Sequence, residues 1–101
     1  MDHRLELHEL LCSILGSRNV YYQPPESIKM GYPCIIYFKD YAKTTFADNV
    51  PYINKTRYQV IYIDSDPDNS ICEKLSQLPM CLFDRHYISD NLNHDAYKLY
   101  F

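Results

Sequence analysis

The sequence predicts an α+β fold, in which a mostly antiparallel sheet of about five strands carries two helices on one face, in the order α-β-β-β-α-β-β. Apolar residues recur at helical spacing in two segments, and alternating or continuous apolar runs mark the strands. Hairpin-like links join most of these strands, which favours antiparallel pairing. With 101 residues and no internal repeat or linker, the chain is expected to form a single domain over residues 1–101.

The N-terminal half predicts one helix and two strands. Leucine and isoleucine recur at helical spacing over residues 2–15, and Gly16 ends this amphipathic helix. Residues 19–23 predict a short strand that ends at two prolines, because proline lacks the backbone N–H and fixes φ. The apolar run 33–38 predicts a strong strand, which can continue to Tyr41.

Residues 42–54 are polar and weakly periodic, and they predict a long hairpin loop. The segment is longer than the roughly two to five residues of ordinary hairpin turns. Long loops in compact domains often carry function, so we expect partner contacts in this loop. The alternative is a flexible tip without a role.

The C-terminal half predicts three strands. Residues 56–63 alternate between two sides and give the clearest strand pattern in the chain. Residues 80–88 predict the next strand, 90–93 its turn, and 95–101 the strand that completes the sheet.

The second helix is expected between the first two of these strands. Asp66 is the predicted N-cap, Pro67 takes the first helical position, and Pro79 ends the helix. Asp64, Asp66 and Asp68 also alternate like the first ligands of a calcium loop. Such a loop needs a glycine at its sixth position and a glutamate at its twelfth, and these positions hold Asn69 and Leu75. The helix cap is therefore the better interpretation.

The composition argues against several classes of function. Ten basic residues against thirteen acidic ones give a formal net charge of −3, which argues against a domain that coats DNA or RNA. No apolar run approaches the roughly 18 residues of a membrane span, and the N-terminus does not resemble a signal peptide, so we expect a chain made and folded in a cytosol. Four dispersed cysteines predict reduced thiols, with no cofactor. Eleven tyrosines suit sheet faces or protein interfaces.

The block 84–95 is dense in polar residues set among aromatic and aliphatic ones. His86, Asp90, Asn93 and His94 resemble the histidine and asparagine set of metal-dependent nucleases, and His94 could lie across the hairpin from His86. Against this interpretation stand the missing basic residues and the missing glycine-rich loop for phosphate. A zinc site that uses Cys72 or Cys81 with His86 would have a spacing that fits no common zinc module.

The same block also suits an assembly surface. Asn91 and Asn93 tolerate turn conformations and bond their own backbone. Alternation along a strand puts Asp84 and Arg85 on opposite faces, so that one charge could meet a neighbouring subunit while the other supports the fold.

Four stretches of the chain carry a resemblance to a known family: residues 19–30, 32–37, 78–81 and 83–95, which read NVYYQPPESIKM, YPCIIY, LPMC and FDRHYISDNLNHD. In these stretches the sequence resembles the tail-completion family (tail-terminator, or tail-to-head joining proteins) of long-tailed bacteriophages of Gram-positive hosts. The resemblance covers most of the chain and follows the same order of elements.

The resemblance implies a non-enzymatic structural protein of the virion, which forms a ring of six subunits in the phage neck. Such a ring sits on the last ring of the tail tube, stops tail polymerisation and presents the docking face for the head. The implied partners are other copies of the chain, the tail-tube protein and a head-closure or connector protein, and assembly takes place in the host bacterial cytoplasm. DNA would pass through the lumen without specific binding, because like charges repel.

We expect subunit and partner contacts in the loop 42–54, which matches the long hairpin of that family, and in the block 84–95. The candidate interface residues are Phe46, Asp48, Asn49, Tyr52, Asp84, Arg85, His86, Asn91, Asn93, His94 and Asp95. The nearest alternative is a head-closure or minor capsid connector protein of the same neck. A more distant alternative is a metal-dependent nuclease that uses His86 and His94.

Overall fold

A computed structural model describes residues 3–24, 29, 31–40, 57–66 and 70–101. These residues form two helices and five strands: α1 (His3–Leu15), β1 (Val20–Tyr22), β2 (Cys34–Lys39), β3 (Arg57–Asp64), α2 (Ile71–Ser76), β4 (Cys81–Ser89) and β5 (Leu92–Tyr100). The α+β class and the predicted order of elements are confirmed.

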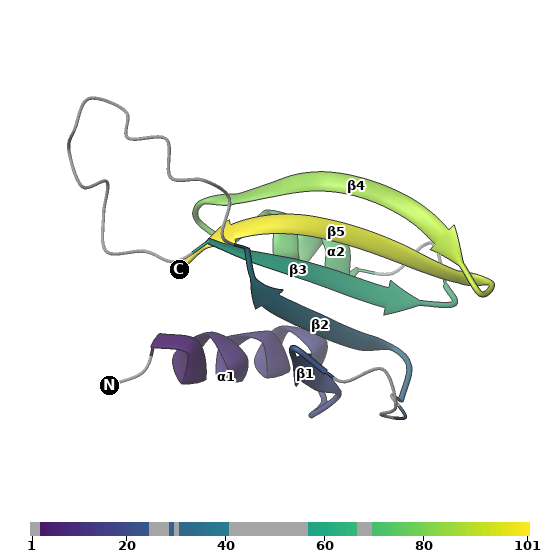
Figure 1. The fold of residues 1–101 in the computed structure, drawn as a ribbon, viewed down its shortest axis with the longest axis horizontal. Helices are drawn as coiled ribbons and strands as arrows, with labels where there is room; N and C mark the ends of the chain where they lie inside the picture. The colour runs from purple at the N-terminus through teal and green to yellow at the C-terminus, as the bar shows by residue number, and fades with distance from the viewer. Residues whose placement is uncertain (1–2, 25–28, 30, 41–56, 67–69) are drawn as a thin grey trace.

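The strands form one sheet in the order β1-β2-β3-β5-β4 (Figure 1). Only β1 and β2 run parallel, and every other neighbouring pair is antiparallel. The sheet is therefore mostly antiparallel, as predicted, with one parallel pair at its short edge. The long β4 forms the opposite edge.

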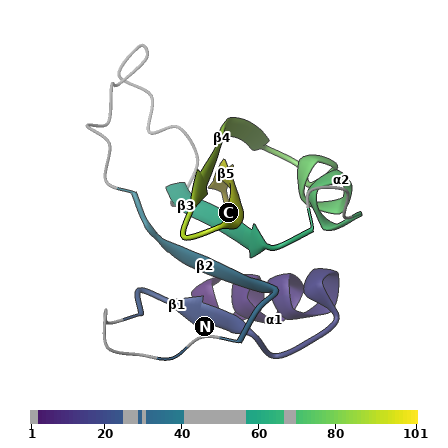
Figure 2. The same ribbon diagram turned by 90° about the vertical axis from the view of Figure 1, so that its right-hand side faces the viewer.

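The two helices do not form one continuous layer. α1 packs beside β1 and β2, whereas the short α2 packs beside β4, toward the opposite edge of the sheet (Figure 2). The prediction of two helices on one face was therefore too simple. What the helices share is a core, because leucines of both contribute to the same buried cluster.

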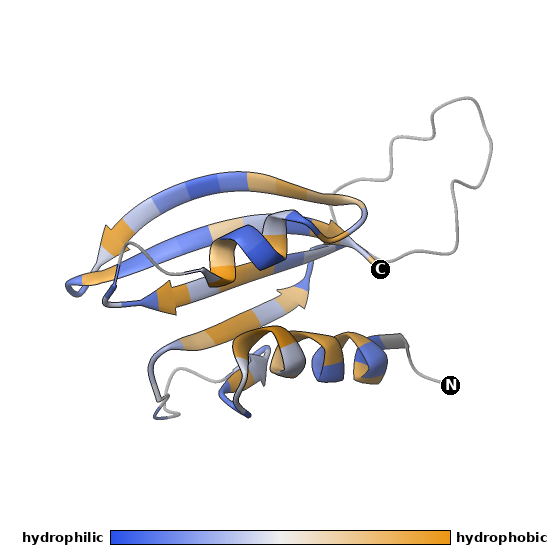
Figure 3. Ribbon diagram, turned by 180° about the vertical axis from the view of Figure 1, so that it is seen from behind, coloured by the Kyte–Doolittle hydropathy of each residue, from blue (hydrophilic) through white to orange (hydrophobic). Residues whose placement is uncertain are grey.

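The buried residues of the first core cluster join both helices to four strands, β1, β2, β3 and β5. Its strand residues lie on one face of the sheet, because the register pairs Ile35 with Tyr62 and Val60 with Tyr97. Figure 3 shows β2 as an almost continuous apolar strand beside α1. The buried members are Leu7, Leu11, Cys12, Val20, Ile35, Tyr37, Tyr58, Val60, Tyr62, Leu75, Tyr97 and Leu99.

A second, smaller cluster lies on the opposite face of the sheet. It consists of buried Cys34, Ile61, Ile63 and Ala96, and no described helix contributes to it. Half-buried residues of β1, β2 and β5 pack against it: Tyr21, Ile36, Phe38 and Leu92. Burial raises the pKa of the Cys34 thiol to about 11, so this cysteine is held as a neutral thiol.

The predicted start of the second helix was wrong. α2 begins at Ile71 with Ser70 at its N-cap, and the Ser70 side chain makes no capping hydrogen bond. Asp66 instead lies in a turn, where its backbone N–H donates to Asp64 Oδ1 over 3.1 Å. The same Asp64 carboxylate accepts from the Tyr62 hydroxyl at 2.6 Å, which fixes it at the end of β3. The expectation for Pro67 falls outside the described residues.

Polar contacts hold α1 against the sheet at Tyr37. The His8 Nδ1 atom lies 2.9 Å from the Tyr37 hydroxyl oxygen, and Arg4 Nη1 donates to the same oxygen at 3.5 Å. Burial lowers the pKa of His8, and the positive charges of Arg18 and Arg4 lower it further. The folded protein therefore favours the neutral imidazole.

Replacing a buried leucine of α1 should destabilise the fold, and an exposed leucine of the same helix supplies the control. We expect Leu11→Ala to lower the free energy of unfolding by about 2–5 kcal/mol, because Leu11 is fully buried and its removal leaves a cavity. Leu5→Ala should change it by less than about 0.5 kcal/mol, since Leu5 is 55% exposed. Urea denaturation measures both, and equal effects would contradict the assignment of the buried face.

The lowered pKa of His8 predicts a pH dependence of stability. The unfolded chain binds a proton at His8 near the ordinary pKa of 6.5, whereas the folded chain binds it only at lower pH. The contribution of His8 is therefore complete above 6.5 and is lost as the pH falls through the lowered folded pKa. As the pH falls below 6.5, the denaturation midpoint should decrease less for His8→Gln than for the unaltered protein, because the variant lacks this titrating group. Parallel profiles would contradict this.

Candidate interaction surface on the β4–β5 hairpin

A tight two-residue turn joins β4 to β5. Asp90 and Asn91 form it, with φ values of 53° and 62°, and Ser89 pairs directly with Leu92. Both residue types tolerate the left-handed conformation that such hairpin turns require. The predicted turn over 90–93 is therefore shorter than expected, and β5 begins earlier.

A β-bulge interrupts β4 at Asp84. Phe83 pairs with Tyr97 and Arg85 with Ala96, so Asp84 is an extra residue without its own partner on β5. Its carboxylate Oδ2 accepts from Gln59 Nε2 at 3.2 Å, and Gln59 lies on the face of the second core cluster. Arg85 lies on that face as well, opposite Ala96.

The prediction that Asp84 and Arg85 lie on opposite faces was therefore wrong. It assumed strict alternation along the strand, and the bulge inserts one residue into that alternation. As a result, the two opposite charges lie next to each other on one face of the edge strand.

The pairing register separates the two histidines of the hairpin. His86 pairs with Asp95, whereas His94 pairs with Tyr87, and these successive positions of the ladder point to opposite faces of the sheet. The expectation that His94 lies across from His86 was wrong for this reason. Among the described residues there is no group of three or more histidine, cysteine, aspartate or glutamate side chains that could hold a metal ion.

Asp95 connects the hairpin to α2. Its Oδ1 atom lies 2.7 Å from His86 Nδ1, and its Oδ2 atom accepts from Cys72 Sγ at 3.2 Å. The hydroxyl of Tyr97 also donates a hydrogen bond of 3.4 Å to the Cys72 carbonyl oxygen. The Asp95 side chain is only 15% exposed, against 43% for His86, so the carboxylate anchors the imidazole at the surface.

The other face of the hairpin carries a stack of rings. Tyr87 and His94 are stacked with centroids 4.7 Å apart, and the Arg85 guanidinium lies 5.4 Å from the centre of the Tyr87 ring. His94 Nδ1 donates to the Leu92 carbonyl at 3.0 Å, and Asn93 Nδ2 donates to the Ser65 carbonyl at 3.4 Å. These contacts give the polar residues of β5 a role in fixing the hairpin.

The outer strand of this hairpin is exposed over most of its length. β4 is nine residues long, none of its side chains is fully buried, and no described strand pairs with its outer edge. Leu82, Phe83 and Ile88 are 63%, 57% and 68% exposed. Leu82 lies on the face of the second cluster, and Phe83 and Ile88 lie on the opposite face. Apolar side chains therefore flank, on both faces, a strand edge that pairs with no strand of the described residues.

The structure brings seven of the predicted interface residues together on the hairpin. Asp84, Arg85 and His86 lie on β4, Asn91 lies in the turn, and β5 carries Asn93, His94 and Asp95. The other four, Phe46, Asp48, Asn49 and Tyr52, lie outside the described residues. Sequence reasoning missed Leu82, Phe83 and Ile88, because an apolar residue in a strand is normally expected to face the core.

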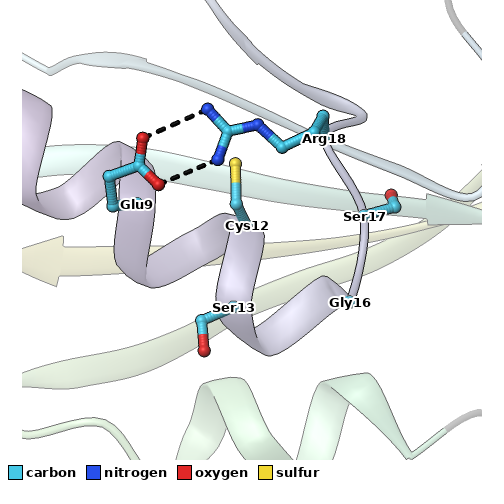
Figure 4. A pocket seen from close by; sticks show the side chains of 6 residues that line it. All are labelled: Glu9, Cys12, Ser13, Gly16, Ser17 and Arg18. Carbon is cyan, nitrogen blue, oxygen red and sulfur yellow. Dashed lines mark hydrogen bonds and ion pairs between the residues drawn. The ribbon is translucent and has the colours of Figure 1, made fainter.

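A shallow pocket at the end of α1 offers no comparable surface (Figure 4). Glu9 and Arg18 close one side of it through two hydrogen bonds, at 2.8 and 3.1 Å, so their charges compensate each other. Burial raises the pKa of Cys12 beside them, which leaves the thiol neutral. The lining residues are Glu9, Cys12, Ser13, Gly16, Ser17 and Arg18.

No family model, curated protein or solved structure matches this chain. None of the helices in the described part of the chain is long and apolar enough to span a membrane.

The left-handed turn at Asn91 gives a testable prediction for the hairpin. Asn91→Ala should lower the free energy of unfolding by about 1 kcal/mol, because the left-handed conformation has a higher conformational energy for alanine than for asparagine. Asn91→Gly is the matched control, since glycine removes the same side chain without this steric cost. If both variants lose equal stability in urea denaturation, the side chain and not the turn conformation would be responsible.

Proposed function

We propose that this chain is a structural subunit of the neck of a long-tailed bacteriophage. In this role it forms a ring that caps the tail tube, ends tail polymerisation and provides the docking surface for the head. The carrying observation is the exposed edge strand β4, with its apolar side chains on both faces. The resemblance of four stretches of the sequence to the tail-completion family supplies the biological setting.

An edge such as β4 favours assembly for a physical reason. A free strand edge presents unpaired backbone N–H and C=O groups, and proteins that stay monomeric usually shorten, charge or cover such edges. β4 carries charge only in its middle, whereas Leu82, Phe83 and Ile88 stay exposed beside that charge. Binding of a partner strand would satisfy the backbone groups and remove the apolar side chains from water.

The electrostatics fit a ring around a DNA channel. The chain has a formal net charge of −3, and like charge keeps DNA from adhering to a lumen through which it must slide. The proposed partners are other copies of the chain, the tail-tube protein and a head-closure or connector protein. The proposed location is the virion neck.

Two matched substitutions test the role of β4. Leu82→Asp should abolish capping of tail tubes by the purified protein, because it adds a buried charge to the proposed contact. Leu5→Asp places the same charge at a comparably exposed leucine of α1 and should leave capping intact. Electron microscopy of tubes assembled from the tube protein of the same phage gives the readout, as tubes of limited length with a closed end.

Circular dichroism of both variants controls for folding. A folded Leu82→Asp protein that caps tubes normally would contradict the role of β4. Unaltered protein that binds the portal assembly and not the tail tube would contradict tail capping and place the chain on the head side of the neck.

A further inference from the structure

The outer edge of β4 has a defined pattern of backbone groups. The Tyr100 N–H donates to the Met80 carbonyl at 3.2 Å, so this pair is hydrogen-bonded toward β5. Hydrogen-bonded and non-bonded pairs alternate along an antiparallel ladder, so Cys81 and Phe83 turn their backbone groups outward. At the other end, the tight turn makes Ser89 and Leu92 a bonded pair, which turns Ile88 and His86 outward.

The bulge makes this edge symmetric about the midpoint between Asp84 and Arg85. Those two side chains share one face. One step out in each direction, Phe83 and His86 both lie on the opposite face. Leu82 and Tyr87 return to the face of Asp84, and Cys81 and Ile88 lie with Phe83 again. Without the bulge, the residues at equal distances from this midpoint would fall on opposite faces.

We propose that β4 pairs with β4 of a second copy of this chain, antiparallel, around a two-fold axis at this midpoint. Antiparallel pairing about such an axis keeps the same face of both sheets on the same side, as the symmetric faces of β4 require. The outward backbone groups of Phe83 then meet those of His86 in the second copy, and those of Cys81 meet those of Ile88. Two five-stranded sheets become one continuous sheet.

The side chains match in this register as well as the backbone. Asp84 lies opposite Arg85 of the second copy, and the symmetry axis repeats this pair. Within the described part of the chain neither residue has an ion-pair partner, so both charges are available. The exposed Leu82 meets Tyr87 of the second copy, and the exposed Ile88 meets Cys81. Opposite charges and apolar groups placed directly across a ladder stabilise pairing.

This inference does not rest on the phage role. A two-fold contact is closed and cannot propagate around a ring, because both copies use the same surface. The pair is therefore the form of the free protein, and assembly with other partners has to exchange it for a different contact at β4.

Charge reversal tests the register directly by analytical ultracentrifugation. The unaltered protein should sediment as a dimer. Asp84→Arg and Arg85→Asp should each weaken dimerisation at least about tenfold, since each places like charges opposite each other twice. Mixing these two variants should restore a dimer, because the mixed pair again sets arginine against aspartate at both positions. Gln59→Ala controls for the lost hydrogen bond between Gln59 and Asp84, and it should dimerise normally.

A disulfide provides a second measurement that does not depend on charge. Ile88→Cys should form an intermolecular disulfide with native Cys81 under mild oxidation, since bonded pairs of an antiparallel ladder have Cα atoms about 5.5 Å apart. Ser89→Cys is the matched control, because its side chain lies on the other face, and it should not cross-link this way. Non-reducing electrophoresis and peptide mapping identify the bond.

Any of four results would overturn the proposal. These are a monomeric unaltered protein at micromolar concentration, single charge variants that associate as tightly as the unaltered protein, folded variants that form no mixed dimer, or no disulfide between positions 81 and 88. Circular dichroism of each variant establishes that it is folded.

Discussion

The fold depends on the burial of β3 on both of its faces. Every residue from Val60 to Asp64 is buried, so this strand contributes to the first core cluster on one side and to the second on the other. β3 also supplies the pairing surface for β2 and β5, which are distant from each other in the sequence. The hairpin that carries the exposed edge is therefore held in place by β5, which pairs along its length with a strand buried on both faces. Such support gives the side chains of the hairpin a fixed register, because they stand on an element that the core positions.

Buried tyrosines connect this sheet to the elements around it. Tyr37, Tyr58, Tyr62 and Tyr97 lie in the first cluster, and a buried hydroxyl is costly unless it forms a hydrogen bond. Tyr62 donates to Asp64 and Tyr97 to the Cys72 carbonyl, while Tyr37 meets His8. Burial, with these contacts, raises the pKa of Tyr62 and Tyr97. The high tyrosine content, which suited either sheet faces or interfaces, is thus partly a property of the core.

Periodicity predicted the elements whose burial is regular. The helix α1 and the strands β2, β3 and β5 were anticipated within a few residues, because each has a continuous or alternating apolar face. The start of α2 was not, since the Asp64 carboxylate holds the backbone of Asp66 in a turn that competes with a helix cap. The bulge at Asp84 was missed because the segment Asp-Arg-His contains no glycine, the residue that commonly indicates a bulge in a strand. The exposure of Leu82, Phe83 and Ile88 follows from the place of β4 at the end of the sheet, which only tertiary structure defines.

The bulge also affects how this protein can change during evolution. Along most strands, a substitution alters one side chain and leaves the orientation of its neighbours unchanged. At Asp84, loss of a single codon would remove the extra residue and restore strict alternation, so that Cys81, Leu82 and Phe83 keep both their faces and their partners on β5. The negative charge beside Arg85 would be lost, and the spacing between Phe83 and His86 along the edge would shorten by one residue in the same step, with the core unaltered. No single substitution changes the charge and the spacing of this edge together, so a deletion at the bulge has an effect that substitution cannot reproduce.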